Sequence, residues 1–155
     1  MIALAFIAAA VALAADTEGI VKKDLGLAPY ELVREYVQRD AEGQFLKTNT
    51  WWNAAVECPD CMGGPDKFQV ISGFSIKRAS ELEFTVTYAY EGTLGRDGFV
   101  ADQKTMTVPF TVAKTAWGYK LRRRAYQMVS LAFVCSHELA NMTPAAAIKL
   151  KSLCP

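Results

Sequence analysis

The sequence predicts an α+β fold in which N-terminal helices pack on an antiparallel sheet and a short helix ends the chain. The apolar residues repeat with a helical period of about 3.6 up to residue 55 and alternate with a period of two from residue 68 onward. The chain has 155 residues, 52% of them hydrophobic, which suits one domain with a single core.

Residues 1–14 are predicted to be a secretory signal peptide. Residues 1–15 carry no charged or polar side chain, and a helix of that length reaches about 22 Å, short of the roughly 30 Å hydrocarbon core of a membrane. Ala12 and Ala14 supply the small-x-small pattern at which such peptides are cut. We therefore expect a mature domain of residues 15–155 that is periplasmic or secreted and has no stable membrane anchor.

Two helices are predicted ahead of the sheet. In the first, residues 29–41, apolar residues recur on one face, and Pro29 suits the first turn because the N–H that it lacks would have no partner there. Gly43 interrupts this pattern, and residues 44–55 are predicted to form the second helix. The two prolines and two glycines of residues 57–67 then indicate a loop.

Strands and a last helix are predicted for the rest of the chain. The strand candidates are residues 68–77, 81–91, 104–114, 117–123 and 126–135. Residues 92–98 are predicted to be a turn. Pro109 cannot donate to a strand ladder, so its strand is expected to lie at an edge or to carry a bulge. Thr143 and Pro144 are the expected N-cap and first residue of a helix that runs to Leu150.

Two helices followed by a curved antiparallel meander resemble the nuclear transport factor 2-like (SnoaL-like) superfamily. Four segments are similar to exported bacterial proteins of that type: residues 31–46, 68–76, 109–121 and 143–153. The resemblance implies a deep pocket between sheet and helices and a homodimer formed through the sheet. The superfamily contains isomerases, dehydratases, cyclases, hydrolases and proteins that only bind, so the fold does not choose among these functions.

Four cysteines are the sharpest local feature. In an oxidising compartment this even number indicates two disulfides, for which three pairings exist. We favour Cys58 with Cys61, which closes the loop, and Cys135 with Cys154, which joins the last helix to the last strand. The alternatives are thiol–disulfide exchange at Cys58 and Cys61, or a zinc site that adds Cys135 and His137. The glycines and the proline after Cys61 are a poor start for the helix that a redox-active Cys-x-x-Cys pair needs. The zinc site would leave Cys154 without a partner. We therefore predict disulfides and neither metal nor cofactor.

An acidic residue at the end of the first helix, Asp40, is the candidate general base. An apolar pocket raises a carboxyl pKa toward neutrality. The aromatic residues expected on the pocket wall are Tyr36, Trp52, Tyr88 and Tyr90. The alternative interpretation is structural, because Asp40 can also cap the helix or form an ion pair, and aromatic residues on an alternating strand usually belong to the core.

Two further side chains are considered for a site. In the basic run Lys120–Arg124, we expect the side chains of Lys120, Arg122 and Arg124 to face solvent. Arg123 is then expected to point inward, where it can bind an anion at the mouth of the pocket. The alternative is a solvated strand end. His137 is the single histidine and is expected in a surface loop before the last helix, so a Ser-His-Asp triad would depend on it alone.

The charge balance and the site residues lead to one functional hypothesis and one alternative. With 17 basic and 16 acidic residues, the chain offers no broad field to nucleic acid. We predict an exported domain that binds a small apolar or amphipathic molecule, or a protein partner, through its concave sheet. The alternative is a small enzyme of isomerase, dehydratase or hydrolase type with Asp40 as base. Asp40→Asn is expected to spare stability and binding in the first case and to abolish turnover in the second. A cavity closed by core side chains would leave only a structural or interaction role.

Overall fold

The computed structural model describes residues 23–44, 50–57, 67–95, 97–122, 128–137 and 144–154. The predicted signal peptide, Cys58, Cys61 and Arg123 lie outside these ranges, so their predicted roles stay predictions. In the described part, no helix is both long and apolar enough to cross a membrane.

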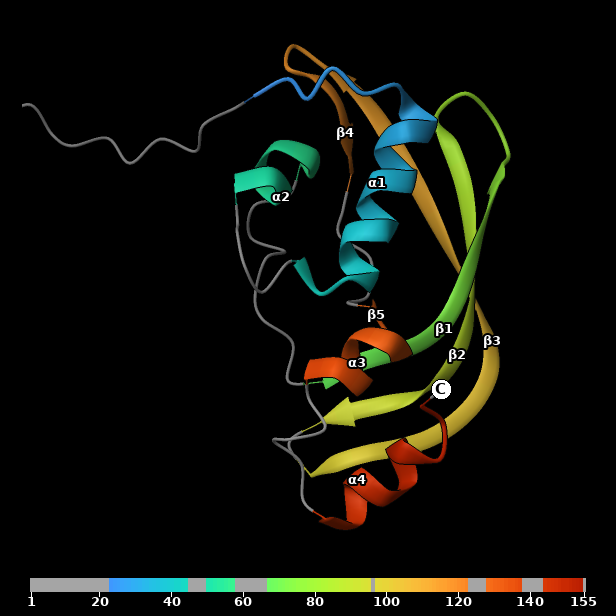
Figure 1. Ribbon diagram of the computed structural model, residues 1–155. Helices are drawn as coiled ribbons and strands as arrows, with labels where there is room; N and C mark the ends of the chain where they lie inside the picture. The colour runs from blue at the N-terminus through green and yellow to red at the C-terminus, as the bar shows by residue number, and fades with distance from the viewer. Residues whose placement is uncertain are drawn as a thin grey trace, which may run out of the picture.

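A strongly curved sheet forms the body of the described structure (Figure 1). Its strands are β1 (Lys67–Arg78), β2 (Glu83–Gly95), β3 (Gly98–Thr115), β4 (Gly118–Leu121) and β5 (Met128–Ser130), and they lie in the order β4-β3-β2-β1-β5. Pairs of neighbours are antiparallel except β1 and β5, which run parallel over residues 69–71 and 128–130. The predicted all-antiparallel sheet is therefore wrong at this edge. The chain leaves β4 at one edge and returns at the other, so no hairpin imposes an antiparallel direction on β5.

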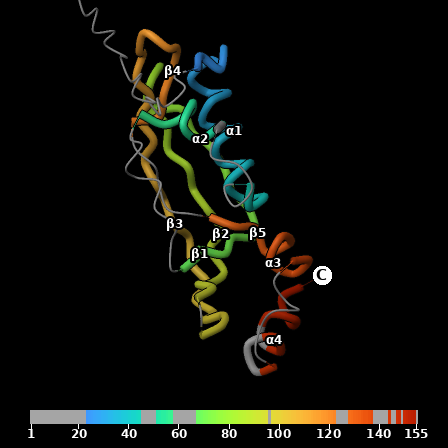
Figure 2. Tube along the Cα trace, turned by 90° about the vertical axis from the view of Figure 1, so that its left-hand side faces the viewer, coloured from blue at the N-terminus to red at the C-terminus, as the bar shows by residue number. Residues whose placement is uncertain are grey.

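The helices of the described chain lie on the concave side of this sheet. α1 (Pro29–Ala41) and α2 (Thr50–Ala55) precede the strands, whereas α3 (Leu131–His137) and α4 (Pro144–Lys151) follow them. In Figure 1, α1 covers the upper part of the sheet and α3 and α4 the lower part, and the turned view of Figure 2 places α1, α3 and α4 along one side of the strands. An α+β fold with a curved sheet is thus confirmed.

Several predicted elements have different limits in the structure. The described part of the second helix is Thr50–Ala55, and residues 45–49 of the predicted helix lie outside the described ranges. β2 and β3 extend into the predicted turn of residues 92–98. Residues 131–135, predicted as strand, belong to α3. A short apolar run has no period that separates a buried strand from a buried helix, which explains this error. Pro109 is at the predicted edge, because β4 pairs only with residues 112–115 of β3.

The core consists of two clusters of buried side chains. The upper cluster forms where the apolar face of α1 meets the inner residues of β2, β3 and β4, and it includes Leu32, Val33, Tyr36, Val37, Val86 and Phe110. The lower cluster lies under α3 and α4 and consists of Val70, Leu94, Phe99, Val129, Val134 and Leu150. Each such side chain contributes about 1.5–3 kcal/mol when it is fully removed from water. The two clusters meet at β5, where Met128 belongs to the upper cluster and Val129 to the lower one.

Lys120 in β4 is buried, although the sequence predicted that it faces solvent. Only 6% of the residue is exposed. Its Nζ donates hydrogen bonds to the backbone carbonyl of Lys23, at 2.7 Å, and to that of Ala54 at the end of α2. Burial lowers the pKa of Lys120, and the nearby Asp24 carboxylate opposes this shift. The ammonium group satisfies a carbonyl that the helix end leaves without a partner, which explains why it is not in solvent.

Candidate functional site

Asp40 lies inside the protein rather than on the wall of an open pocket. The residue is 1% exposed, and its Oδ2 accepts a hydrogen bond of 3.0 Å from the backbone N–H of Met128. This contact joins the last turn of α1 to the first residue of β5. A carboxylate in this position holds two elements together, which agrees with the structural interpretation of Asp40.

The aromatic residues predicted for the pocket wall are packed as core. Tyr36, Trp52, Tyr88 and Tyr90 are exposed by 0%, 1%, 1% and 4%. The ring of Tyr36 meets that of Trp52 edge-on with their centroids 5.0 Å apart, and it meets Phe110 at 5.6 Å. Such pairs stabilise a folded core. The space in which the sequence placed a ligand is filled here by these side chains.

Tyr88 shares its surroundings with Asp40 and Tyr36. The pKa of the Tyr88 phenol is raised well above its ordinary value, first by burial and then by the charges of Asp40 and Tyr36. Tyr36 and Asp40 belong to α1 and Tyr88 belongs to β2, so this electrostatic interaction lies between the helix and the sheet. The phenol is therefore neutral in the folded protein at every pH at which proteins ordinarily work.

We expect Tyr88→Phe to make the free energy of unfolding less sensitive to alkali. Above pH 10 or so, the phenol loses its proton in the unfolded chain but keeps it in the fold, so the wild type loses stability as the pH rises. Without this phenol, the slope of the unfolding free energy against pH should be shallower by up to about 1.4 kcal/mol per pH unit. Urea denaturation at several pH values above 8 measures both slopes. Tyr30→Phe, at a site that is 41% exposed, is the control, and equal slopes for Tyr88→Phe and the wild type would contradict the linkage.

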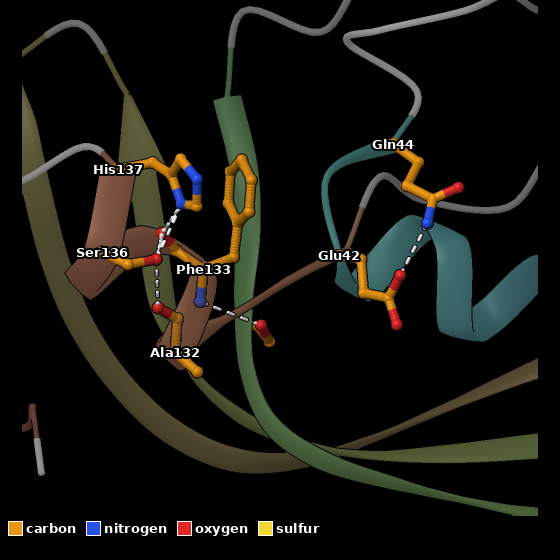
Figure 3. A pocket seen from close by; sticks show the side chains of 7 residues that line it. Glu42, Gln44, Ala132, Phe133, Ser136 and His137 are labelled. Atoms are coloured by element: carbon orange, nitrogen blue, oxygen red, sulfur yellow. Dashed lines mark hydrogen bonds between the residues drawn. The ribbon is translucent and has the colours of Figure 1, made fainter.

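A hollow of about 400 Å³ lies between the end of α1 and α3 (Figure 3). The residues that line it are Glu42, Gln44, Ser130, Ala132, Phe133, Ser136 and His137. Its volume falls within the range of roughly 300–1,000 Å³ that is usual for small-molecule sites. None of the residues that the sequence suggested for a pocket is among them. His137 alone had been singled out, and it lies at the end of α3 rather than in the predicted loop.

One wall of the hollow is the carboxylate of Glu42, held by two amide groups. Its Oε1 accepts a hydrogen bond from Gln38 and its Oε2 one from Gln44, both at 2.6 Å. The side-chain amide oxygen of Gln44 accepts a hydrogen bond of 2.9 Å from the Arg39 guanidinium, which also forms an ion pair with Glu35. Glu42 is thus oriented by neutral donors, while the charge of Arg39 is shared with a different carboxylate.

A close contact between Gly43 and Phe133 fixes the distance between the two walls. Gly43 ends α1 in the left-handed region, with φ of 64°, and a Cβ at this position would lie 2.5 Å from Cζ of Phe133. Only glycine combines this backbone conformation with so near an approach of the ring. The sequence therefore needs glycine here for packing as well as for ending the helix.

The opposite wall is an aromatic pair whose histidine is held through Nδ1. The His137 ring stacks on Phe133 with centroids 4.5 Å apart. Its Nδ1 lies 2.7 Å from Oγ of Ser136 and 3.2 Å from the carbonyl oxygen of Phe133. Oγ of Ser136 also lies 2.9 Å from the carbonyl oxygen of Ala132 and 3.0 Å from that of Phe133. These contacts fix the imidazole against its own helix.

A disulfide between Cys135 and Cys154 fixes the helix that carries this wall. The pairing is the one predicted for these two cysteines, and it ties α3 to the chain just after α4. The zinc site that would have used Cys135 is contradicted, because this sulfur is already bonded. Within the described residues, no group of three or more His, Cys, Asp or Glu could hold a metal ion.

Fold and hollow together define a small α+β domain with a curved mixed sheet and, in its described part, a hollow between α1 and α3. The chain matches no protein-family model, no curated protein and no solved structure. The support for a function is therefore the arrangement of its own side chains.

Proposed function

We propose that the protein is an exported small-ligand-binding domain of the nuclear transport factor 2-like type. In this proposal, helices pack on a cone-shaped sheet, and the ligand binds in the hollow between α1 and α3. The observation that carries the proposal is the hollow itself, which is open to solvent and combines a fixed carboxylate, an imidazole and an aromatic ring. Convergent polar groups beside an apolar surface are typical of ligand sites.

Export is supported by two independent features. The Cys135–Cys154 disulfide is compatible with an oxidising compartment. The uninterrupted apolar segment at residues 1–15, with its small-x-small pattern, is typical of a cleaved secretory signal.

The surroundings of Asp40 and Ser136, the two side chains that could act in catalysis, favour binding over catalysis. Asp40 is closed off from solvent and bonded to the backbone of β5. The hydroxyl of Ser136 lies within hydrogen-bond distance of two carbonyl oxygens of its own helix, and these compete with His137 for its proton. The hollow can thus hold a molecule without an evident group to attack it.

The proposal is tested with the chain recovered from an exporting host. Its mass should correspond to a start at Ala15 with all four cysteines oxidised. In amide NMR spectra, a mixed set of cationic, anionic and neutral fragments should shift residues 42–44 and 130–137. Ala132→Trp, which puts a large ring into the hollow, should abolish these shifts. Ala116→Trp, at an exposed turn, should leave them unchanged. Fragments that shift only other residues, or none at all, would overturn the ligand site.

A further inference from the structure

We infer that the hollow between α1 and α3 selects a small amphipathic molecule that carries a protonated amine. The ammonium group would lie beside the carboxylate of Glu42, and the apolar part would lie against the ring of Phe133. This inference rests on the proposed function, since it names the class of ligand for the same site.

The first argument is the charge of the hollow. Among the described residues that line it, Glu42 is the acid, and its two hydrogen-bond donors are the neutral amides of Gln38 and Gln44. The nearest cation in this network, Arg39, forms an ion pair of 2.7 Å with Glu35. Glu42, Glu35 and Arg39 together carry one net negative charge, so a cation is the complementary ligand charge.

The second argument is the balance of donors and acceptors. The Glu42 oxygens are acceptors that retain further lone pairs. In contrast, the hydroxyl of Ser136 and one N–H of Gln44 are engaged within the protein. An ammonium group offers three donors to such a site, whereas a carboxylate or phosphate would meet like charge and few donors.

The third argument is the apolar surface beside these acceptors. Phe133 and Ala132 line the same hollow, and Phe133 is held in place by Gly43 on one side and by the stacked His137 on another. A preformed ring loses little freedom when a ligand packs on it. An amine with a short apolar body therefore matches the hollow better than a fully polar cation does.

The experiment compares 2-phenylethylamine with 2-phenylethanol, which has the same ring and chain length but no charge. Amide NMR titration of the full chain near neutral pH gives both dissociation constants. The amine should bind about fivefold more tightly, or better. Glu42→Gln should remove this difference by weakening only the amine. His137→Phe, which keeps an aromatic ring beside Phe133, should leave this difference in place. Glu81→Gln, an exposed acid in the distant turn between β1 and β2, should change neither.

The outcomes separate this inference from the proposed function. Equal affinities for the amine and the alcohol, or an amine affinity that Glu42→Gln leaves unchanged, would overturn the ligand class while the hollow remains a binding site. The ligand class is likewise overturned if neither compound binds but other fragments shift residues 130–137. If no fragment of any charge shifts the amide signals of these residues, both the proposed ligand site and the inferred ligand class are wrong.

Discussion

Replacing Cys135 and Cys154 together by serine is expected to lower the free energy of unfolding by about 3 kcal/mol. The disulfide closes a loop with a sequence separation of 19, and a crosslink over this length restricts the unfolded chain by roughly that amount. The loss should concentrate on α3 and α4, because the bond joins these helices. Urea denaturation measures the global effect, and hydrogen exchange at residues 131–137 measures the local one.

The double replacement of Cys58 and Cys61 by serine is the matched control. A disulfide between these two would close a very short loop and should contribute much less stability. The Cys135–Cys154 variant should also lose affinity for fragments in the hollow, since α3 supplies Phe133, Ser136 and His137. Unchanged unfolding and exchange in that variant would show that packing alone holds α3.

Replacing Asp40 by alanine is expected to lower the free energy of unfolding by about 2–3 kcal/mol. The change leaves the N–H of Met128 buried without the acceptor that it has in the fold, and a hydrogen bond to a charged group contributes about that much. Asp40→Asn keeps an oxygen that can accept the bond, so it should cost less. The sequence suggested that Asp40→Asn would be nearly neutral, whereas the burial of this side chain now predicts a measurable loss.

Arg34→Ala is the control for Asp40, because Arg34 is an exposed residue on the same helix. Thermal and urea unfolding compare the variants, and fragment binding is measured on those that fold. If Asp40→Ala leaves the unfolding free energy unchanged but abolishes binding, the carboxylate belongs to the ligand site rather than to the framework.

Local patterns predicted the elements whose signal is long and periodic. The apolar face of α1 and the alternation along β2 extend over several turns or pairs of residues, and both elements lie where they were expected. The direction of β5 and the helical state of residues 131–135 were missed. Both features depend on the position of residues 128–137 beside β1, at the sheet edge opposite β4. Neighbouring residues in the sequence do not determine that position.

The candidate site was largely beyond sequence reasoning. Its residues come from the end of α1 and from α3, about ninety positions apart in the chain. The two available signals were Gly43 after a helical run and the single histidine, and neither indicates the other. The aromatic residues that suited a pocket were those that the fold needed for its core, because large apolar surfaces gain most from burial.

The amino-acid sequence alone was enough to predict an α+β chain and the presence of disulfides, since periodicity and cysteine number are local or countable properties. Cysteine number left three pairings open, and the favoured pair, Cys135 with Cys154, is the one in the described structure. The burial of Asp40 and Lys120, and the hollow that Glu42 shares with His137, emerged only from the folded arrangement. Burial and proximity depend on which distant surfaces meet, and the packing of α1 and α3 against one sheet sets both.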